Sequence, residues 1–252
     1  MNFRMKYTSG RLLASFVLCL LLPIAGAAES RQATAASYVQ LGDKFLREKQ
    51  FDRAVSAYGL ALQFVPDFAE AFFKRGIAQQ ARGDFNAAIA DFGRTLEAMP
   101  GCAEAYANRG YLLALRQDVD QALSDWAAAL EINPKLTSAL YNRGNLQLNQ
   151  GNPDLAIADY DRLLQFEPSH LMAINNRGIA RLKKGDIDGA LADFNQAIRI
   201  NSQFPEAYVN RGLLRLQLGD KTAAERDFSR SIHLRPSLRE FIETRVDQLS
   251  QR

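Results

Sequence analysis

The sequence predicts an all-α solenoid made of six helix-turn-helix repeats and closed by a C-terminal helix. Three periodic features predict it: a glycine, an alanine and an aromatic residue each recur every 34 residues through most of the 252-residue chain. A short helical repeat cannot bury its own apolar face alone, so a repeat of this kind must stack on its neighbours around a continuous core. With 47% hydrophobic residues, the chain has enough apolar side chains to build that core.

The N-terminal residues 1–27 have the pattern of a secretory signal peptide. A leader with three basic residues precedes an apolar run from Leu12 to Leu22, which Pro23 ends. The small residues Ala25–Ala28 then offer a cleavage site after Ala27, and the apolar run is too short to span a bilayer comfortably. We therefore expect an exported, periplasmic protein. The alternative is an uncleaved segment that anchors the chain in the membrane, which is the only membrane contact we expect.

Cleavage after Ala27 would remove three basic residues and no acidic one. The remaining chain then has 28 lysines and arginines against 28 aspartates and glutamates. A neutral chain without a basic block gives no electrostatic reason to expect nucleic acid as a partner. Cys102 is its one cysteine, so no internal disulfide is expected, and we interpret this residue as a small side chain beside a loop.

Each 34-residue unit has apolar residues at helical spacing in two segments, which predicts a pair of helices. The periodic positions identify the repeats. The glycines are Gly42, Gly76, Gly110, Gly144, Gly178 and Gly212. The alanines are Ala54, Ala88, Ala122, Ala156, Ala190 and Ala224, and the aromatic residues are Tyr58, Phe92, Trp126, Tyr160, Phe194 and Phe228. Pro66, Pro100, Pro134, Pro168 and Pro236 end five of the six units. The small residues should let the paired helices approach closely, with the aromatic ring filling the space beside them.

The residue types in the turn inside a repeat also predict how the two helices end and begin. Glycine can take the left-handed conformation that stops the first helix, and the following aspartate can cap the second helix. This predicts turns at residues 83–84, 185–186 and 219–220. In the fourth repeat we expect Asn152 to act as the cap and Pro153 to occupy the first helical position.

This pattern resembles the tetratricopeptide repeat, with an aromatic or apolar residue early in the first helix followed by the glycine, alanine, aromatic and proline positions. Six repeats begin near residues 35, 69, 103, 137, 171 and 205, within a repeat domain over 28–238. The resemblance implies a right-handed superhelix whose concave face is lined by the first helices. It also implies a protein-interaction scaffold that binds a protein or an extended peptide in that groove, in the assembly of bacterial envelope complexes.

The segment 239–252 is expected to form the closing helix. Its apolar side chains fall on one helical face, where they can cover the last repeat. They are Phe241, Ile242, Val246 and Leu249.

A periodic pair of charges predicts ion pairs across the two helices of a repeat. An arginine directly before the repeat glycine and an aspartate 16 residues later recur together, and the first repeat lacks both. The pairs are Arg75 with Asp91, Arg109 with Asp125, Arg143 with Asp159, Arg177 with Asp193, and Arg211 with Asp227. The alternatives are independent solvated charges, or pairing with the next repeat, in which Arg245 would serve Asp227.

The candidate binding residues form a ladder of asparagines at one position of the first helix: Asn108, Asn142, Asn176 and Asn210. An asparagine amide offers both a donor and an acceptor, so it can bind the backbone of a peptide of any sequence. The ladder resembles that of the O-GlcNAc transferase repeats, and Gln40 and Lys74 depart from it. The family's groove positions add Phe73, Tyr111, Tyr141, Asn145, Asn149 and Asn175. The alternative is that the asparagines only bond between neighbouring helices.

The sequence gives no catalytic, metal or cofactor motif. His170 and His233 lack the spacing of a metal pair and are interpreted as surface residues, and the glycines follow the repeat rather than a phosphate loop. We therefore expect a non-enzymatic scaffold. The alternative is an accessory or minimal enzyme with an unrecognised site.

Overall fold

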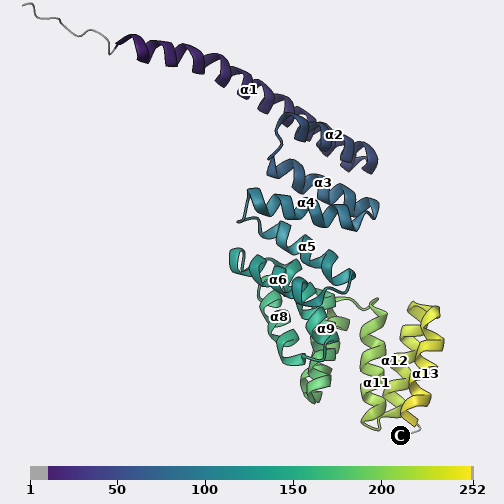
Figure 1. The fold of residues 1–252 in the computed structure, drawn as a ribbon. Helices are drawn as coiled ribbons and strands as arrows, with labels where there is room; N and C mark the ends of the chain where they lie inside the picture. Colours follow the sequence, from purple (N-terminus) through teal and green to yellow (C-terminus); the bar gives the residue numbers. More distant parts are fainter. Residues whose placement is uncertain (1–10, 251–252) are drawn as a thin grey trace, which may run out of the picture. The chain divides into compact units, whose positions relative to one another are not determined.

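The computed structural model describes residues 11–250, with side chains described from residue 28 to residue 249. These residues form α-helices and one 3-10 turn and contain no strand (Figure 1). The helices are α1 (Arg11–Arg47), α2 (Phe51–Phe64), α3 (Ala69–Arg82), α4 (Phe85–Ala98), α5 (Ala103–Leu115), α6 (Val119–Ile132), α7 (Thr137–Asn149), α8 (Pro153–Phe166), α9 (Leu171–Lys184), α10 (Ile187–Ile200), α11 (Pro205–Gln217), α12 (Lys221–Leu234) and α13 (Arg239–Ser250). The 3-10 turn is η1 (Pro236–Leu238).

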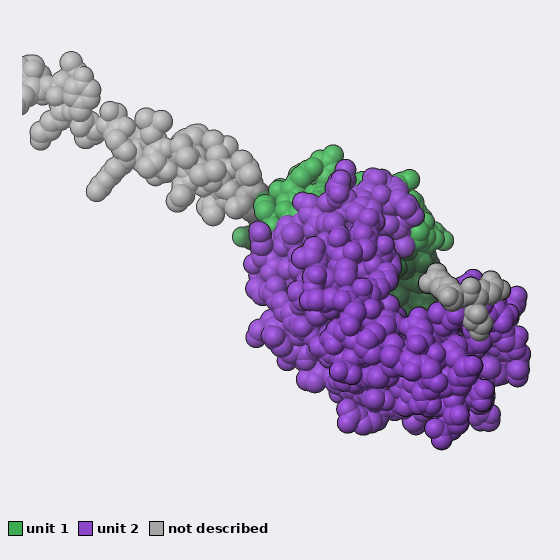
Figure 2. All heavy atoms as spheres, turned by 90° about the horizontal axis from the view of Figure 1, so that it is seen from below, with its two compact units in different colours: residues 1–112 green, residues 113–252 purple. Residues whose placement is uncertain are grey.

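The chain divides into two compact units, with the boundary after Leu112 inside α5 (Figure 2). In the first unit, α1 packs on α2 and α3 packs on α4. In the second unit, α7 packs on α8, α9 on α10 and α11 on α12. Each of these hairpins also contacts the next along the chain within its unit, through α2 and α3, α8 and α9, or α10 and α11. The predicted all-α solenoid of helical pairs is confirmed.

The repeat glycine allows the two helices of a hairpin to touch. A Cβ atom on Gly144 would lie 2.9 Å from the ring of Tyr160, and one on Gly178 would lie 2.7 Å from the ring of Phe194. Real Cβ atoms do not approach other atoms so closely, so only glycine fits there. The two rings are fully buried. The predicted close approach, with an aromatic ring filling the space, is therefore confirmed.

The turns inside the repeats follow the predicted chemistry with one correction. Gly83, Gly185 and Gly219 have φ of 87°, 88° and 85°, the left-handed region that glycine tolerates best. The aspartate after each glycine accepts a hydrogen bond from the main-chain N–H three residues later: Asp84 from Ala87, Asp186 from Gly189 and Asp220 from Ala223.

The predicted side-chain cap at Asn152 is wrong. Pro153 does open α8, and Asn152 precedes it, but the Asn152 amide donates to Gln147 Oε1 at 2.9 Å and caps no N–H group. The hydrogen bond to Gln147 holds the Asn152 side chain in an orientation that turn spacing alone cannot reveal. The turn keeps its shape because Gly151, at a φ of 80°, supplies the left-handed residue.

The first helix is much longer than a repeat helix. α1 runs from Arg11 through Pro23 to Arg47, so the expected leader and the first helix of the first repeat are one continuous helix. The Ala27 cleavage site falls within it, and removal of the leader stays a prediction. Residues 1–10, with two of the leader's three basic residues, lie outside the described residues. No helix among the described residues combines the length and apolar character needed to cross a bilayer.

The closing helix α13 covers the last repeat with half of its predicted apolar stripe. Ile242 is 3% exposed and packs with Val209 and Phe228, and Val246 lies against the same cluster. Phe241 is 47% exposed. Its ring projects to the side of α13 that faces α9 and α11, where it lines a pocket.

Candidate functional site

Bidentate ion pairs join the two helices of a repeat as predicted. In each, the arginine donates Nε–H and Nη2–H to the two carboxylate oxygens of an aspartate 16 residues later, over 2.6 to 3.0 Å. The pairs formed are Arg75 with Asp91, Arg143 with Asp159, Arg177 with Asp193, and Arg211 with Asp227. All four aspartates are buried. Arg109 and Asp125 belong to different units, and their pairing stays a prediction.

The competing arrangement for the last aspartate is wrong. Arg245 donates to Gln248 Oε1 at 3.0 Å, and Asp227 receives its second arginine from Arg215 Nη1 at 2.7 Å. Arg215 lies four residues after Arg211 on α11, so both guanidinium groups reach the same carboxylate. A buried carboxylate is best satisfied by several donors, which a second arginine on the same helix face supplies.

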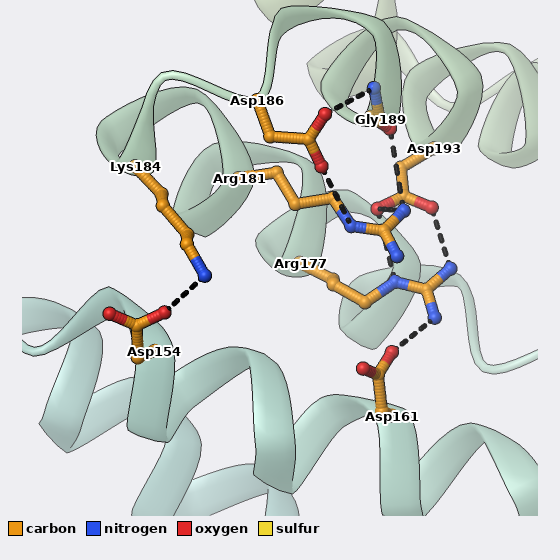
Figure 3. Close-up of polar contacts among 8 residues, drawn as sticks. All are labelled: Asp154, Asp161, Arg177, Arg181, Lys184, Asp186, Gly189 and Asp193. Carbon is orange, nitrogen blue, oxygen red and sulfur yellow. Dashed lines mark hydrogen bonds and ion pairs between the residues drawn. The ribbon is translucent and has the colours of Figure 1, made fainter.

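The fifth repeat has the same second arginine and a bridge to the repeat before it. Arg181 Nη1 donates to Asp193 at 2.9 Å, while Arg177 Nη1 extends to Asp161 on α8 at 2.7 Å (Figure 3). Burial disfavours the charge of Arg177, but its hydrogen bonds to Asp193 and Asp161 outweigh that penalty and raise its pKa. Arg177 therefore ties α8, α9 and α10 together and fixes how the fifth repeat sits on the fourth.

The sixth repeat repeats this bridge with a neutral partner. Arg211 Nη1 donates to Asn195 Oδ1 on α10 at 2.6 Å. The first helices α7, α9 and α11 touch one another in series within the second unit. These polar ties hold them in a fixed register, so side chains at equivalent positions form a defined surface.

An amide network occupies that surface. Asn176 Nδ2 donates to Asn145 Oδ1 at 2.9 Å and lies 3.5 Å from the Tyr141 hydroxyl. Asn210 Nδ2 donates to Asn175 Oδ1 at 2.9 Å, and Asn175 Nδ2 donates to Asn176 Oδ1 at 3.2 Å. The structure thus brings five of the predicted site residues together, in bonds that run from α7 to α9 and from α9 to α11.

The network divides the predicted site asparagines into bonded and available amides. Asn175 is only 4% exposed and serves as a link between Asn176 and Asn210. Asn142 is half-buried, and its side chain forms no hydrogen bond with another described residue. Asn210 uses its N–H group within the network, while its carbonyl oxygen accepts none from a described residue. Asn142 and the Asn210 oxygen are therefore the groups that can bond to a partner.

The remaining predicted residues form none of the hydrogen bonds of this network. Asn149 is exposed at the end of α7 in the second unit. Phe73, Asn108 and Tyr111 lie in the first unit: the Phe73 ring packs at 5.8 Å from the Phe92 ring, Asn108 is half-buried, and Tyr111 is exposed. In that unit the ladder position is occupied by Lys74, which has no side-chain amide. Its ammonium group forms ion pairs with Asp43 at 2.7 Å and with Glu70 at 3.0 Å.

In five of the six repeats, the type of aromatic ring corresponds to the polarity of the first-helix residue beside it. Where the ring is tyrosine, its hydroxyl donates to a polar residue of the first helix: Tyr58 to Asp43 at 2.8 Å and Tyr160 to Asn145 at 2.7 Å. Where the ring is phenylalanine, the equivalent residue is aliphatic: Phe92 packs with Ile77, Phe194 with Ile179, and Phe228 with Leu213. Burial raises the pKa of Tyr160, which keeps its hydroxyl a hydrogen-bond donor.

An apolar pocket of about 370 Å³ continues the surface from the amide network toward the C-terminus. It lies between α9, α11 and α13 in the second unit, and Asn210 belongs both to its lining and to the network. Apolar lining comes from Ile179, Leu182, Phe194, Leu213, Phe241 and Leu249. This pocket has no direct signal in the sequence, because its third wall depends on how α13 packs on the last repeat.

The two histidines differ in their surroundings. His170 Nδ1 accepts the main-chain N–H of Ala173 at 3.1 Å, so it caps α9, and its ring lies 5.1 Å from the Tyr141 ring. His233 is exposed. Within the described part of the chain, no three histidine, cysteine, aspartate or glutamate residues could together hold a metal ion.

Comparison with protein families gives direct matches to this repeat. Models of the tetratricopeptide repeat match residues 73–137, 137–170 and 205–238, and one described as a TPR repeat matches residues 178–219. The fold and these matches define a helical-repeat solenoid that acts as a protein-interaction scaffold. The chain is a tetratricopeptide-repeat protein.

Solved structures of the same architecture are similar over most of the chain. MamA is 26% identical, with a TM-score of 0.62 over 68% of this chain and 93% of MamA. YrrB, described as a TPR protein with an unusual peptide-binding site, is 17% identical, with a TM-score of 0.67 over 77% of this chain and 99% of YrrB. PilF of Pseudomonas aeruginosa is 17% identical, with a TM-score of 0.73 over 86% of this chain and 99% of PilF. The last two likenesses show the fold alone. No curated protein sequence matches the chain.

Proposed function

We propose that the chain binds an extended polypeptide along the first helices α7, α9 and α11 of its second unit, and that it works by binding alone, without catalysis. The observation that carries this is Asn142, an amide on the shared surface that no described residue bonds. It lies one residue from Tyr141, next to a network that already holds the neighbouring amides in place. The Asn142 amide offers both a donor and an acceptor to a peptide backbone.

The proposal is supported by the contrast between the two parts of the second unit's surface. The Asn142 amide and the Asn210 carbonyl oxygen can form hydrogen bonds with a peptide backbone, while the pocket in the fifth and sixth repeats can take a side chain. Peptide recognition commonly combines these two elements, backbone hydrogen bonds for affinity and pockets for selectivity. A peptide-binding site is described for YrrB, which has the same fold.

We further propose that the protein acts outside the cytoplasm, in the bacterial periplasm, where it assembles envelope complexes. This rests on the leader of residues 1–27 and on the charge balance of the chain that follows it. N-terminal sequencing of the protein from its native envelope fraction should find Ala28 or Glu29 first. An intact Met1 in the membrane fraction would instead support the anchored form.

Site-specific photo-crosslinking in the native envelope tests the binding surface. A photo-reactive residue at Asn149, at the exposed end of α7, should crosslink a partner polypeptide. The matched control places it at Gln165, an exposed amide on the second helix α8 of the same repeat. Equal crosslinking from both positions, or from Gln165 alone, would place binding elsewhere.

A further inference from the structure

We propose that the pocket between α9, α11 and α13 receives one large apolar side chain of the partner polypeptide, and that acidic residues flank that side chain. This inference rests on the proposed function and names the kind of segment that the surface selects.

The pocket has the size and lining of a side-chain site. Its volume is about 370 Å³, within the ordinary range for small-ligand pockets. Its floor is the fully buried ring of Phe194, and the aliphatic chains of Ile179 and Leu213 stand where other repeats place polar groups bonded to tyrosine. An apolar side chain entering the pocket would contact the Phe194 ring and these two aliphatic side chains.

The helix α13 forms the outer wall and leaves an apolar ring exposed. Phe241 is 47% exposed although its neighbour Ile242 is 3% exposed. Ile242 and Val246 therefore pack the helix against the last repeat, whereas Phe241 is not part of that cluster. An exposed phenylalanine at the lip of an apolar pocket gains burial when a partner's side chain enters.

The rim of the pocket carries positive charge only. Lys183 and Arg245 line it, and no acidic residue does so among the described residues. Neither cation pairs with a carboxylate of the described chain: Lys183 donates to the Leu148 main-chain oxygen at 3.2 Å, and Arg245 donates to Gln248. A partner with carboxylates beside its apolar side chain would supply the missing counter-charges.

The opposite side of α13 has the reverse character, which makes this charge specific to one face. The hollow there is lined by Glu225, Glu243 and Asp247 and by no basic residue. An acidic segment is therefore attracted to the pocket side of α13 and repelled from the other.

The pocket also lies in line with the proposed backbone site. Asn210 is shared by the amide network and the pocket wall, and its carbonyl oxygen is unbonded within the described chain. A segment whose backbone bonds to Asn142 and Asn210 would thus pass directly over the pocket mouth. One chain can engage both features without a break.

Selection from a randomised peptide library on the purified protein tests the inference. Selected peptides should share one aromatic or large aliphatic residue next to aspartate or glutamate. The variant Phe241→Ala should weaken these peptides at least about tenfold, about 1.4 kcal/mol, without lowering the melting temperature. The matched control is Phe166→Ala, which removes an equally exposed ring outside the pocket and should bind as well as the parent.

Charge reversal provides the second arm. Selection on the double variant Lys183→Glu with Arg245→Glu should favour lysine or arginine in place of the acidic residues. Peptides that lack an acidic bias, or that bind Phe241→Ala and the parent equally, would overturn the inference. If those same peptides still bound Asn142→Ala more weakly than the parent, the proposed function would stand without this further inference. A protein that selects no peptide at all would overturn both.

Discussion

Buried aspartates are the residues that make this fold most sensitive to single substitutions. Asp159 is 5% exposed and its two oxygens are bonded by one arginine, Arg143. Asp193 is 1% exposed and is bonded by two, Arg177 and Arg181. A buried charge that loses its partner costs several kcal/mol, whereas one that keeps a second partner loses less. The two repeats should therefore respond differently to the loss of an arginine.

The variant Arg143→Leu should destabilise the protein by about 3 kcal/mol, because it leaves the Asp159 carboxylate buried and unpaired. Adding Asp159→Ala should recover part of that loss. The measurement is urea unfolding of the parent, both single variants and the double variant. Strictly additive losses would contradict the coupling that the bidentate geometry implies.

The variant Arg181→Leu is the matched comparison. It removes one donor from Asp193 but leaves the bidentate bonds from Arg177 intact, so its cost should be clearly smaller than that of Arg143→Leu. The same unfolding measurement gives the result. A loss as large as that of Arg143→Leu would mean that the second arginine is the principal partner.

At the scale of the helical pair, close contact depends on the glycine beside the ring. In Gly144→Ala the added Cβ would lie 2.9 Å from the Tyr160 ring and would force α7 away from α8. The expected cost is about 1–3 kcal/mol, as for overpacked cores. Gly101→Ala is the control, since a Cβ there meets nothing within 4 Å. Equal stability of the two variants on thermal unfolding would show that the helices can separate without cost.

The closing helix α13 should separate stability from binding at neighbouring residues. Ile242→Ala removes a buried side chain and should cost about 2 kcal/mol or more. Phe241→Ala should leave the melting temperature almost unchanged, since the ring is half in solvent. Calorimetric melting of both variants checks this. A large loss of stability in Phe241→Ala would show that the ring is part of the core.

The helical pairs could be predicted from the sequence because a fixed spacing repeats the same contact in each repeat. The Arg–Asp pairs were predictable for a related reason: the first repeat has Leu41 and Ala57 in place of both charges. The spacing of residues in the sequence could not reveal hydrogen-bond partners that depend on how far a side chain extends. A second arginine donates to the aspartate in two repeats, and these arginines, Arg181 and Arg215, are also 34 residues apart. This periodic signal was not recognised in the sequence.

The candidate site was predictable only in part. The asparagine ladder follows the repeat, but its division into bonded amides and a free one depends on rotamers at Asn145 and Asn175, which no periodicity encodes. The pocket was not predictable, because its wall is Phe241 on a helix outside the repeats. The closing helix could be predicted, but the orientation in which it docks is a tertiary property.

At the scale of the whole molecule, hydrogen bonds and ion pairs hold the repeats of each unit in register, and we propose that a few unbonded groups on the second unit select a polypeptide. The ion pairs, the glycine contacts and the bonded amides serve rigidity. The Asn142 side chain forms no hydrogen bond with a described residue, and we propose that it serves binding. Stability and binding should therefore respond to different residues on the same helix.

The most direct test is the affinity of Asn142→Ala for a polypeptide captured by the crosslink at Asn149, measured by titration calorimetry. We expect the affinity to fall at least about tenfold, or about 1.4 kcal/mol, with an unchanged melting temperature. Asn176→Ala should lower both affinity and melting temperature, and Gln165→Ala on α8 should change neither. If Asn142→Ala kept full affinity and an intact fold, the Asn142 side chain would not be part of the binding surface.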